Sequence, residues 1–179
     1  EIYNLMQSLD IEETVDRLVH RIDFGAIANT VVVTNDLGAA FVATTKGIAV
    51  VDTLALQQFD ANPDVEGINM IPVPGGAVTA LAVDPANRYL YAAALGKVYV
   101  INIDPGKPNY LKVLPYGSNM IDVHVEHNGR EYGHITSMAL NTDGTRLYVG
   151  VPVSEMFGEI GWASAGQAVP GEVKVINVN

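Results

Sequence analysis

The fold is decided by the stretch Gly75–Asp104, which reads GGAVTALAVDPANRYLYAAALGKVYVINID. It contains three short apolar runs rich in β-branched and aromatic residues: Val78–Val83, Tyr89–Ala93 and Val98–Ile103. Turn-forming residues separate these runs at Asp84–Asn87 and at Leu95–Lys97. No run is long enough for a helix with an apolar stripe. The stretch therefore predicts an antiparallel meander with tight turns.

The same pattern recurs downstream. The run ITSMAL is followed by a turn at Asn141–Gly144, by RLYVGV and, after a long interruption, by GEVKVINV. Leu90 and Tyr91 match Leu147 and Tyr148, which come 57 residues later. The turn chemistry predicts that Gly144 has a positive φ.

A weaker copy lies upstream, where TVVVT, AFVAT and IAVVD follow one another between residues 30 and 52. In this copy Phe41 is aligned with Leu90, at an offset of 49 residues. Three copies of a strand-rich unit with a period of roughly 40–55 residues predict a propeller or an array of sheets.

Four local motifs of the units carry a family resemblance. They are a turn after the first strand (Val83–Pro85, Thr142–Gly144), a Tyr-containing strand (Tyr91–Ala93, Tyr148–Gly150), a V-x-V-type strand (Val50–Asp52, Val100–Asn102, Val175–Asn177) and a closing segment (Ile71–Pro74, Leu114–Gly117). From about Leu18 to Asn179 the chain resembles the YVTN-type β-propeller repeats of bacterial and archaeal surface proteins. The Asn that gives this family its name is absent from all three copies. The resemblance implies a propeller fold and an extracellular, cell-surface or periplasmic location, and little about chemistry.

The predicted fold class is all-β, a partial propeller over residues 25–179 built from about three four-stranded antiparallel blades. The blades are expected at about 25–74, 75–117 and 133–179, with insertions at 117–134 and 152–170. Three blades are too few for a normal closed ring, which needs about four or more. The chain is therefore expected to be a piece of a longer propeller, one half of a homodimer, or an open array whose sheet edges are covered by a partner.

The segment 1–24 allows two interpretations. Asp10 and Glu13 resemble a capping box, and Ile11 begins a helical spacing of apolar residues, which predicts a short helix. Alternatively, Arg17–Phe24 is a strand, the outer strand of a preceding blade. Such a strand could complete the last blade, because that copy ends after its third strand.

Composition restricts the partners. The 179 residues are 49% hydrophobic and 17% charged, with a net charge of −10 and a sequence pI near 4.6. This charge opposes binding to nucleic acid or to an anionic membrane surface. No stretch approaches the roughly 18 consecutive apolar residues of a membrane span. Cysteine is absent, which excludes disulfides, thiolate zinc sites and cysteine nucleophiles.

The first insertion holds three of the four histidines. An extended segment would place Asp122, His124 and Glu126 on one side. With the two later histidines these residues suggest zinc or another transition metal, for which the candidate ligands are His124, Glu126, His127 and His134. The alternative is a solvent-exposed hairpin whose turn is Asn128-Gly129.

The second insertion is apolar and contains the only tryptophan. Its large side chains could be exposed anchors for a protein or a sugar ring, or they could fold back to cap the blade. The candidate binding residues are Met156, Phe157 and Trp162, together with Tyr132 of the first insertion.

A smaller departure from the repeat is the segment 59–68. Asp60, Asn62, Asp64 and Glu66 alternate there with other residues, a spacing that calcium loops use. The EF-hand pattern fails, because Val65 stands at its glycine position. The alternative to a calcium site is a solvated acidic turn.

The two insertions are expected at the same end of the stack. In a meander, two connections lie at the same end of a blade. One joins the second strand to the third, and the other brings the chain in from the preceding blade. We therefore expect the loops 116–134 and 152–170 to lie there and to touch.

The core is expected to bury the alternate apolar residues of the second and third copies: Leu81, Val83, Leu90, Tyr91, Val98, Val100, Ile101, Met138, Leu140, Leu147, Val149, Val175 and Ile176.

No catalytic motif is present, because the chain has no nucleophile elbow, phosphate loop or dinucleotide fingerprint. The leading hypothesis is therefore a non-enzymatic propeller module that recognises a protein or a glycan through loops on one face. No cofactor is firmly predicted; calcium and zinc are the candidates. The competing hypothesis is part of a propeller enzyme, lactonase-like or a metal- or cofactor-dependent periplasmic oxidoreductase, with a site at the His-rich loop.

Overall fold

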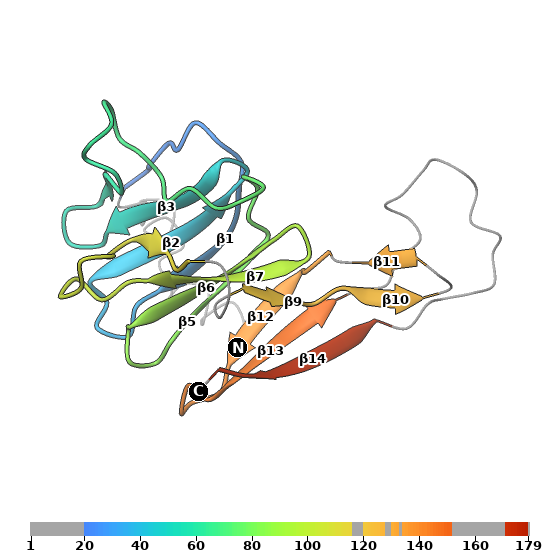
Figure 1. Cartoon of the computed structure of the whole chain (residues 1–179). Coiled ribbons are helices and arrows are strands. Elements are labelled where there is room, and N and C mark those ends of the chain that lie inside the picture. The colour runs from blue at the N-terminus through green and yellow to red at the C-terminus, as the bar shows by residue number, and fades with distance from the viewer. Residues whose placement is uncertain (1–19, 116–119, 128–129, 133, 152–170, 179) are drawn as a thin grey trace, which may run out of the picture.

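The computed structural model of the chain describes residues 20–115, 120–127, 130–132, 134–151 and 171–178. These residues form strands, turns and loops and contain no helix (Figure 1). No helix that is long and apolar enough to cross a membrane is therefore found in them. The all-β prediction is confirmed.

The first sheet contains four antiparallel strands in the order in which they occur in the chain. They are β1 (Ala28–Val33), β2 (Ala39–Thr44), β3 (Gly47–Asp52) and β4 (Gln57–Phe59). The outer edge of β3 is covered in two pieces. β4 pairs with residues 50–52, and Ile71 forms an isolated bridge to Ile48.

The second sheet repeats this plan. Its strands are β5 (Ala80–Val83), β6 (Tyr89–Ala94), β7 (Lys97–Asn102), β8 (Lys112–Val113) and β9 (Met120–Asp122). The outer edge of β7 is shared, since β8 pairs with its last two residues and β9 with its first three. The outer strands are shorter than expected: β8 is only a part of the predicted YLKVLPYG strand, and β4 precedes the predicted closing segment at Ile71–Pro74.

The third sheet has three strands: β12 (Ser137–Leu140), β13 (Arg146–Val151) and β14 (Glu172–Asn177). A separate two-stranded hairpin, β10 (Val125–His127) and β11 (Arg130–Tyr132), lies between the second and third sheets in the chain. The prediction that the last copy ends after its third strand agrees with this sheet.

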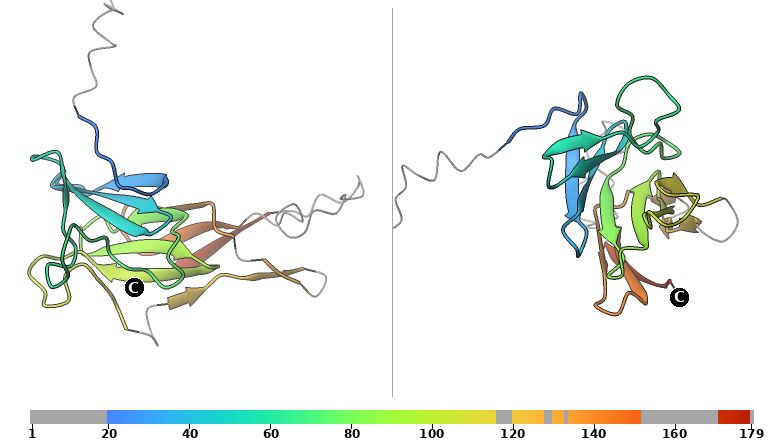
Figure 2. Two further views of the ribbon diagram at one scale, coloured as in Figure 1. Left: turned by 90° about the horizontal axis from the view of Figure 1, so that it is seen from above. Right: turned by 90° about the vertical axis from the view of Figure 1, so that its left-hand side faces the viewer.

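The three sheets follow one another as successive blades of a partial propeller (Figures 1 and 2). The first strands of the three sheets are neighbours, because β5 contacts both β1 and β12. Equivalent hydrogen bonds tie one blade to the next: Asn29 Nδ2 donates to Val78 O at 2.7 Å, and Thr79 Oγ1 donates to Ile135 O at 2.7 Å.

The turn between the first and second strands is the same in all three sheets. Leu37, Asn87 and Gly144 occupy equivalent positions with φ of 59°, 56° and 71°. The amide of each donates to the carbonyl of the residue three positions earlier. The prediction of a positive φ at Gly144 is confirmed. A Cβ at Gly144 would also lie 2.8 Å from Asp84 Oδ1, so this turn packs closely against the turn of the second sheet.

These turns correct the alignment of the first copy. Leu37 and Asn87 are 50 residues apart, and the same offset matches Phe41 with Tyr91 rather than with Leu90. The pairing agrees, because Val33 faces Ala40 where Val83 faces Leu90. The predicted match between Phe41 and Leu90 is therefore wrong by one residue. A shift of one residue in a strand exchanges the two faces of the sheet.

With this register, each sheet points equivalent side chains toward the sheet that follows it. Phe41 of the first sheet and Tyr91 of the second are buried in the interfaces with the next sheet. The core between the first and second sheets includes Phe41, Ile48, Val50, Leu81, Leu90, Ala92, Tyr99 and Ile101. The core between the second and third sheets includes Tyr91, Val98, Val100, Leu147, Val149 and Val151.

The third sheet exposes the same positions. Val173, Tyr148 and Val175 correspond to the buried Val98, Tyr91 and Val100 and are 68%, 37% and 55% exposed. The prediction that Val175 is buried is therefore wrong, because no further sheet covers this face in the described residues. The other predicted core residues are buried or partly buried: Leu81, Val83, Leu90, Tyr91, Val98, Val100, Ile101, Met138, Leu140, Leu147, Val149 and Ile176.

The opposite end of the stack is partly covered. The outer face of the first sheet carries Ala40, Val42, Ala49 and Val51, and Ile22 and Phe24 pack against it. Residues 20–24 contain no strand, so the described part of Arg17–Phe24 does not form the predicted outer strand. The predicted helix from Ile11 lies outside the described residues.

Candidate functional site

The roots of both insertions lie at one end of the third sheet. Gly150, near the end of β13, pairs with Ser137 at the start of β12, and Val151 pairs with Glu172 at the start of β14. The first insertion therefore delivers the chain to the end where the second insertion leaves the sheet, as predicted. Residues 152–170 are outside the described residues, and with them the predicted contact between the two loops.

The hairpin β10–β11 is anchored at both of its roots. On one side β9 pairs with β7, and Val123, which follows β9, is fully buried between the second and third sheets. On the other side Ile135 is buried in the same core. Lys174 Nζ of β14 also donates a hydrogen bond to His124 O. These contacts fix the base from which the hairpin extends away from the sheets (Figures 1 and 2).

Asp122 and His124 form a contact at this base. Asp122 Oδ1 accepts a hydrogen bond from the His124 amide at 3.0 Å and lies 2.5 Å from His124 Nδ1. The amide hydrogen bond, and then the ring contact, lower the pKa of Asp122 below its usual range. β9 ends at Asp122 and β10 begins at Val125, so Val123 and His124 connect the two strands. The side chain of Glu126 lies outside the description, and the placement of Asp122, His124 and Glu126 on one side stays a prediction.

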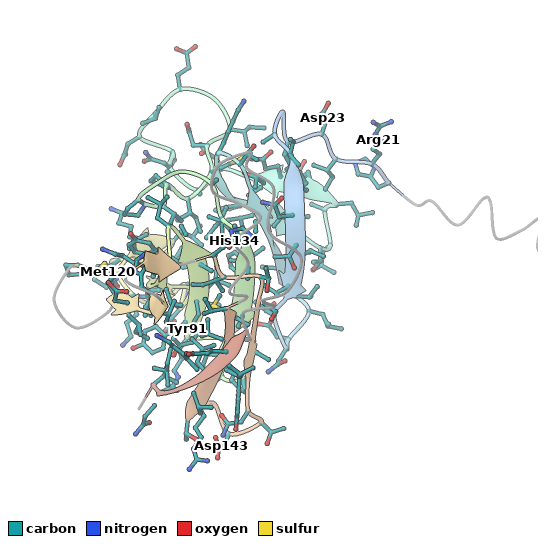
Figure 3. All side chains as sticks on the ribbon, turned by 90° about the vertical axis from the view of Figure 1, so that its right-hand side faces the viewer. Arg21, Asp23, Tyr91, Met120, His134 and Asp143 are labelled. Carbon is teal, nitrogen blue, oxygen red and sulfur yellow. The ribbon has the colours of Figure 1, made fainter. Side chains whose placement is uncertain are left out.

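A cavity of about 400 Å³ opens beside this base and is lined by His124, His134, Thr79, Leu95 and Ile135, together with Ala77 and Gly96. Figure 3 looks at this end of the molecule and shows His134 near the middle of the view. The residues come from the ends of the second and third sheets and from the first insertion. The arrangement brings two of the four predicted metal ligands to one cavity.

The other two predicted metal ligands, Glu126 and His127, lie in β10. His127 pairs with Arg130, so this part of the insertion is a hairpin, as in the alternative interpretation. The predicted turn at Asn128-Gly129 lies outside the described residues. The side chains of Glu126, His127 and Tyr132 lie outside the description. In the described part of the chain, including this cavity, no group of three or more His, Asp or Glu side chains could hold a metal ion.

The loop predicted to bind calcium is held by a side-chain amide. Asn69 Nδ2 lies within 3.2 Å of four oxygens: Asp60 Oδ1 and the carbonyls of Asn62, Val65 and Gly67. Asp60 Oδ1 also accepts hydrogen bonds from the amides of Asn62 at 3.0 Å and Asn69 at 2.9 Å. An amide group therefore occupies the centre toward which the loop oxygens point.

The predicted calcium ligands do not converge. Asp64 and Glu66 are exposed, whereas Asp60 and Asn62 are partly buried in the loop held by Asn69. The backbone amides of Asn62 and then Asn69 lower the pKa of Asp60. The loop thus uses its one inward carboxylate to accept N–H groups.

We expect the substitution Asn69→Ala to raise the pKa of Asp60 toward its ordinary value of 3.8, because the loop loses the group that holds its geometry. The measurement is an NMR titration of the side-chain carboxyl carbons. Since the folded pKa of Asp60 is lowered, its ionised form stabilises the fold above about pH 3.8, and this contribution disappears as the pH falls through the lowered value.

Asp143 is the internal control for this titration. Its pKa is lowered by the hydroxyl and then the amide of Thr145, in a turn of the third sheet. The substitution at Asn69 should leave the pKa of Asp143 unchanged. An unchanged pKa of Asp60 would show that Asn69 does not hold the loop.

The sequence reasoning did not single out Asn69, Lys174 or β9. Asn69 lies just outside the acidic alternation that drew attention to the loop, and Lys174 faces the first insertion only because β14 returns beside it. A run of two apolar residues before Asp122 was the only local signal for β9. The predicted binding residues Met156, Phe157 and Trp162 lie outside the described residues.

No protein-family model and no curated protein matches the chain. Among solved structures, a chain of Kuenenia stuttgartiensis hydrazine synthase is similar with a TM-score of 0.62 and 16% identity, over 90% of this chain and 42% of that one. Two further similarities have TM-scores of 0.49. One is to RRP9 WD40 repeats, with 14% identity, over 72% of this chain and 35% of that one. The other is to a chain of the mitotic checkpoint complex, with 13% identity, over 72% of this chain and 32% of that one. At these identities the similarity concerns the fold, and the chain spans less than half the length of each of these structures.

Proposed function

We propose that this chain is a non-enzymatic propeller module that recognises a protein or a glycan through the end of the stack that carries the hairpin β10–β11. The proposal includes an extracellular, cell-surface or periplasmic location, which rests on the resemblance to YVTN-type repeats. Binding residues on loops held by a rigid scaffold are a common arrangement in proteins.

The observation that carries this proposal is the anchored hairpin. Its two roots, Val123 and Ile135, are buried between the second and third sheets, and Lys174 ties its base to β14. The hairpin itself extends beyond the sheets (Figure 1). An element that is fixed at its base and projects from a packed stack presents the same surface to each partner at a small entropic cost.

The exposed face of the third sheet supports a protein partner as well. Val173, Tyr148 and Val175 form an apolar surface at positions that the other two sheets bury against a neighbour. Exposed apolar patches of this kind mark protein interaction sites. Further blades of a longer propeller, or a second copy of the chain, are the partners that this face would accept.

The experiment compares the intact chain with a variant in which residues 125–132 are replaced by a short Gly-Ser linker. Each protein is immobilised, and binding is measured on a glycan array and by quantitative mass spectrometry of proteins captured from a cell-envelope extract. We expect ligands of the intact chain to be lost in the hairpin variant. A Thr142→Ala variant, changed in an exposed turn of the third sheet between β12 and β13, should retain them.

A ligand that binds the hairpin variant as tightly as the intact chain would contradict the proposed use of this end. The variant keeps the buried roots, Val123 and Ile135, so its circular dichroism spectrum and unfolding midpoint should match those of the intact chain and exclude misfolding as the cause of lost binding.

A second candidate function is part of a propeller enzyme, lactonase-like or a metal- or cofactor-dependent periplasmic oxidoreductase. The cavity that holds His124 and His134, with Asp122 in contact with the His124 ring, favours it. A carboxylate in contact with a histidine ring orients that ring for metal binding or proton transfer. Elemental analysis for zinc and calcium, with an assay of lactone hydrolysis, distinguishes the two functions.

A further inference from the structure

The outer edge of the third sheet differs from the equivalent edges of the other two. In the first sheet β4 and Ile71 together cover the outer edge of β3, and in the second sheet β8 and β9 together cover that of β7. In the third sheet β14 pairs with β13 on one side, and no strand in the described residues pairs with its other side. The repeat thus predicts a missing outer strand.

The backbone of β14 is set up to receive this strand. The amide of Val178 donates to Thr145 O of the β13 side at 3.0 Å. N–H groups alternate in direction along an antiparallel strand, so the amide and carbonyl of Val175 point away from β13. In β7 the equivalent carbonyl is that of Val100, and it accepts a hydrogen bond from the amide of Leu114 at 2.8 Å.

A cavity lies where the side chains of the missing strand would be. Its volume is about 670 Å³. Its lining includes the apolar Val100, Ile121 and Ile176 of the second and third sheets, and the polar Asp84, Arg88 and Asn177. In the second sheet the residue equivalent to Ile176 is Ile101. Ile101 pairs with Val113 of β8 and is fully buried, whereas Ile176 is only partly buried.

We propose that β14 binds an extended segment of a partner polypeptide, with apolar residues at alternate positions, as the fourth strand of the third sheet. The segment pairs antiparallel with β14, donates a backbone hydrogen bond to Val175 O, and places an apolar side chain beside Ile176 in the cavity. Main-chain hydrogen bonds then supply affinity, and the cavity selects the side chains. This surface is separate from the hairpin, so the proposal stands independently of the proposed function.

The occupant is a single strand because the repeat shows what fills this position. β4 and β8 are three and two residues long, and in the described residues no strand of the same sheet pairs with the other side of either. In the second sheet Leu111 and Val113 bury their side chains in the core that such a strand closes. One short segment with this pattern fits the cavity, and a second copy of the whole sheet is an outcome of the test below.

The probe is a fluorescein-labelled peptide, NYLKVLPY, which has the sequence of residues Asn109–Tyr116 of this chain. Binding to the full chain is measured by fluorescence anisotropy, and amide hydrogen exchange is measured by NMR. We expect saturable binding that slows exchange at Val173 and Val175. The amides of Lys174 and Ile176, which point toward β13, serve as the controls and should change little.

Two matched changes test the edge pairing. A peptide that is N-methylated at the residue equivalent to Leu114 lacks the donor for Val175 O, and we expect it to bind about tenfold more weakly or worse. The variant Val175→Pro removes the outward N–H of an edge strand, together with an exposed valine side chain, at a position that tolerates proline. It should weaken binding of the unmodified peptide while the protein stays folded.

The proposal is overturned by an absence of binding, by equal binding of the N-methylated peptide, or by protection at Val100 in place of Val175, which would mean exchange of the peptide with β8. Concentration-dependent protection of Val175 without any peptide would assign the edge to a second copy of the chain and would also overturn it.

Discussion

The substitution Leu90→Ala is expected to lower the free energy of unfolding by about 2–5 kcal/mol. Leu90 is fully buried in the core between the first and second sheets, where it pairs with Val83 and Ile101. The loss combines the transfer free energy of the removed methyl groups with the cavity that a close-packed core leaves behind. Urea unfolding, followed by circular dichroism, measures the effect.

The control for this loss is Leu54→Ala. Leu54 is 91% exposed, so its truncation should change the free energy of unfolding by less than about 0.5 kcal/mol. Equal unfolding midpoints for the two variants would mean that Leu90 is not in the core and that the strand register around it is wrong.

The second large effect is expected for Gly47→Ala, which should destabilise the fold by about 2–5 kcal/mol through strain at a forbidden φ and lost hydrogen bonds. Gly47 has a φ of 132°, which side chains rarely adopt. A Cβ there would lie 2.6 Å from Ile71 O. The same oxygen accepts the Ile48 amide at 3.1 Å, so the added methyl group would also break the bridge that covers the edge of β3.

Two other glycines separate the causes. Gly67 has a φ of 98° and no atom within 4 Å of an added Cβ, so Gly67→Ala should show the backbone strain alone, about 1–2 kcal/mol. Gly38 has no positive φ, and an added Cβ there would be 3.5 Å from Asp36, so Gly38→Ala should be nearly neutral. If Gly47→Ala and Gly67→Ala destabilise the chain equally, the contact with Ile71 contributes nothing.

The sequence predicted the meander because its signals are local. The apolar runs around Val83, Leu90 and Ile101 are strand-length, and the turn residues between them leave few alternatives. The turn at Gly144 needed a residue that tolerates a positive φ, and the prediction there was confirmed. Such features depend on a few neighbouring residues, which a sequence displays directly.

The register of the first copy could not be predicted in the same way. Aligning Phe41 with Leu90 matched two large apolar residues. The position of the turn at Leu37 fixes the strand register, however, and this register matches Phe41 with Tyr91. Residue size is a weak guide here, because both faces of β2 and of β6 are buried and therefore both are apolar.

The candidate site was predicted less completely than the fold. The spacing of Asp122 and His124 drew attention to the base of the hairpin, and the contact between them is present. The role of Asn69 depends on carbonyls of three other residues that a composition pattern does not reveal. The exposure of Val175 depends on the absence of a neighbouring sheet in the described residues, which no property of its own strand encodes.

The equivalence of Phe41, Tyr91 and Tyr148 gives the stack a direction. Phe41 and Tyr91 are each buried against the sheet that follows their own. Tyr148 lies on the last sheet and is partly exposed to solvent. At the trailing end Ile22 and Phe24 act as a cap over the first sheet. In the described residues the two ends of the stack therefore differ in what they offer to water. One end presents an aromatic ring and two valines, whereas Ile22 and Phe24 cover part of the apolar face at the other.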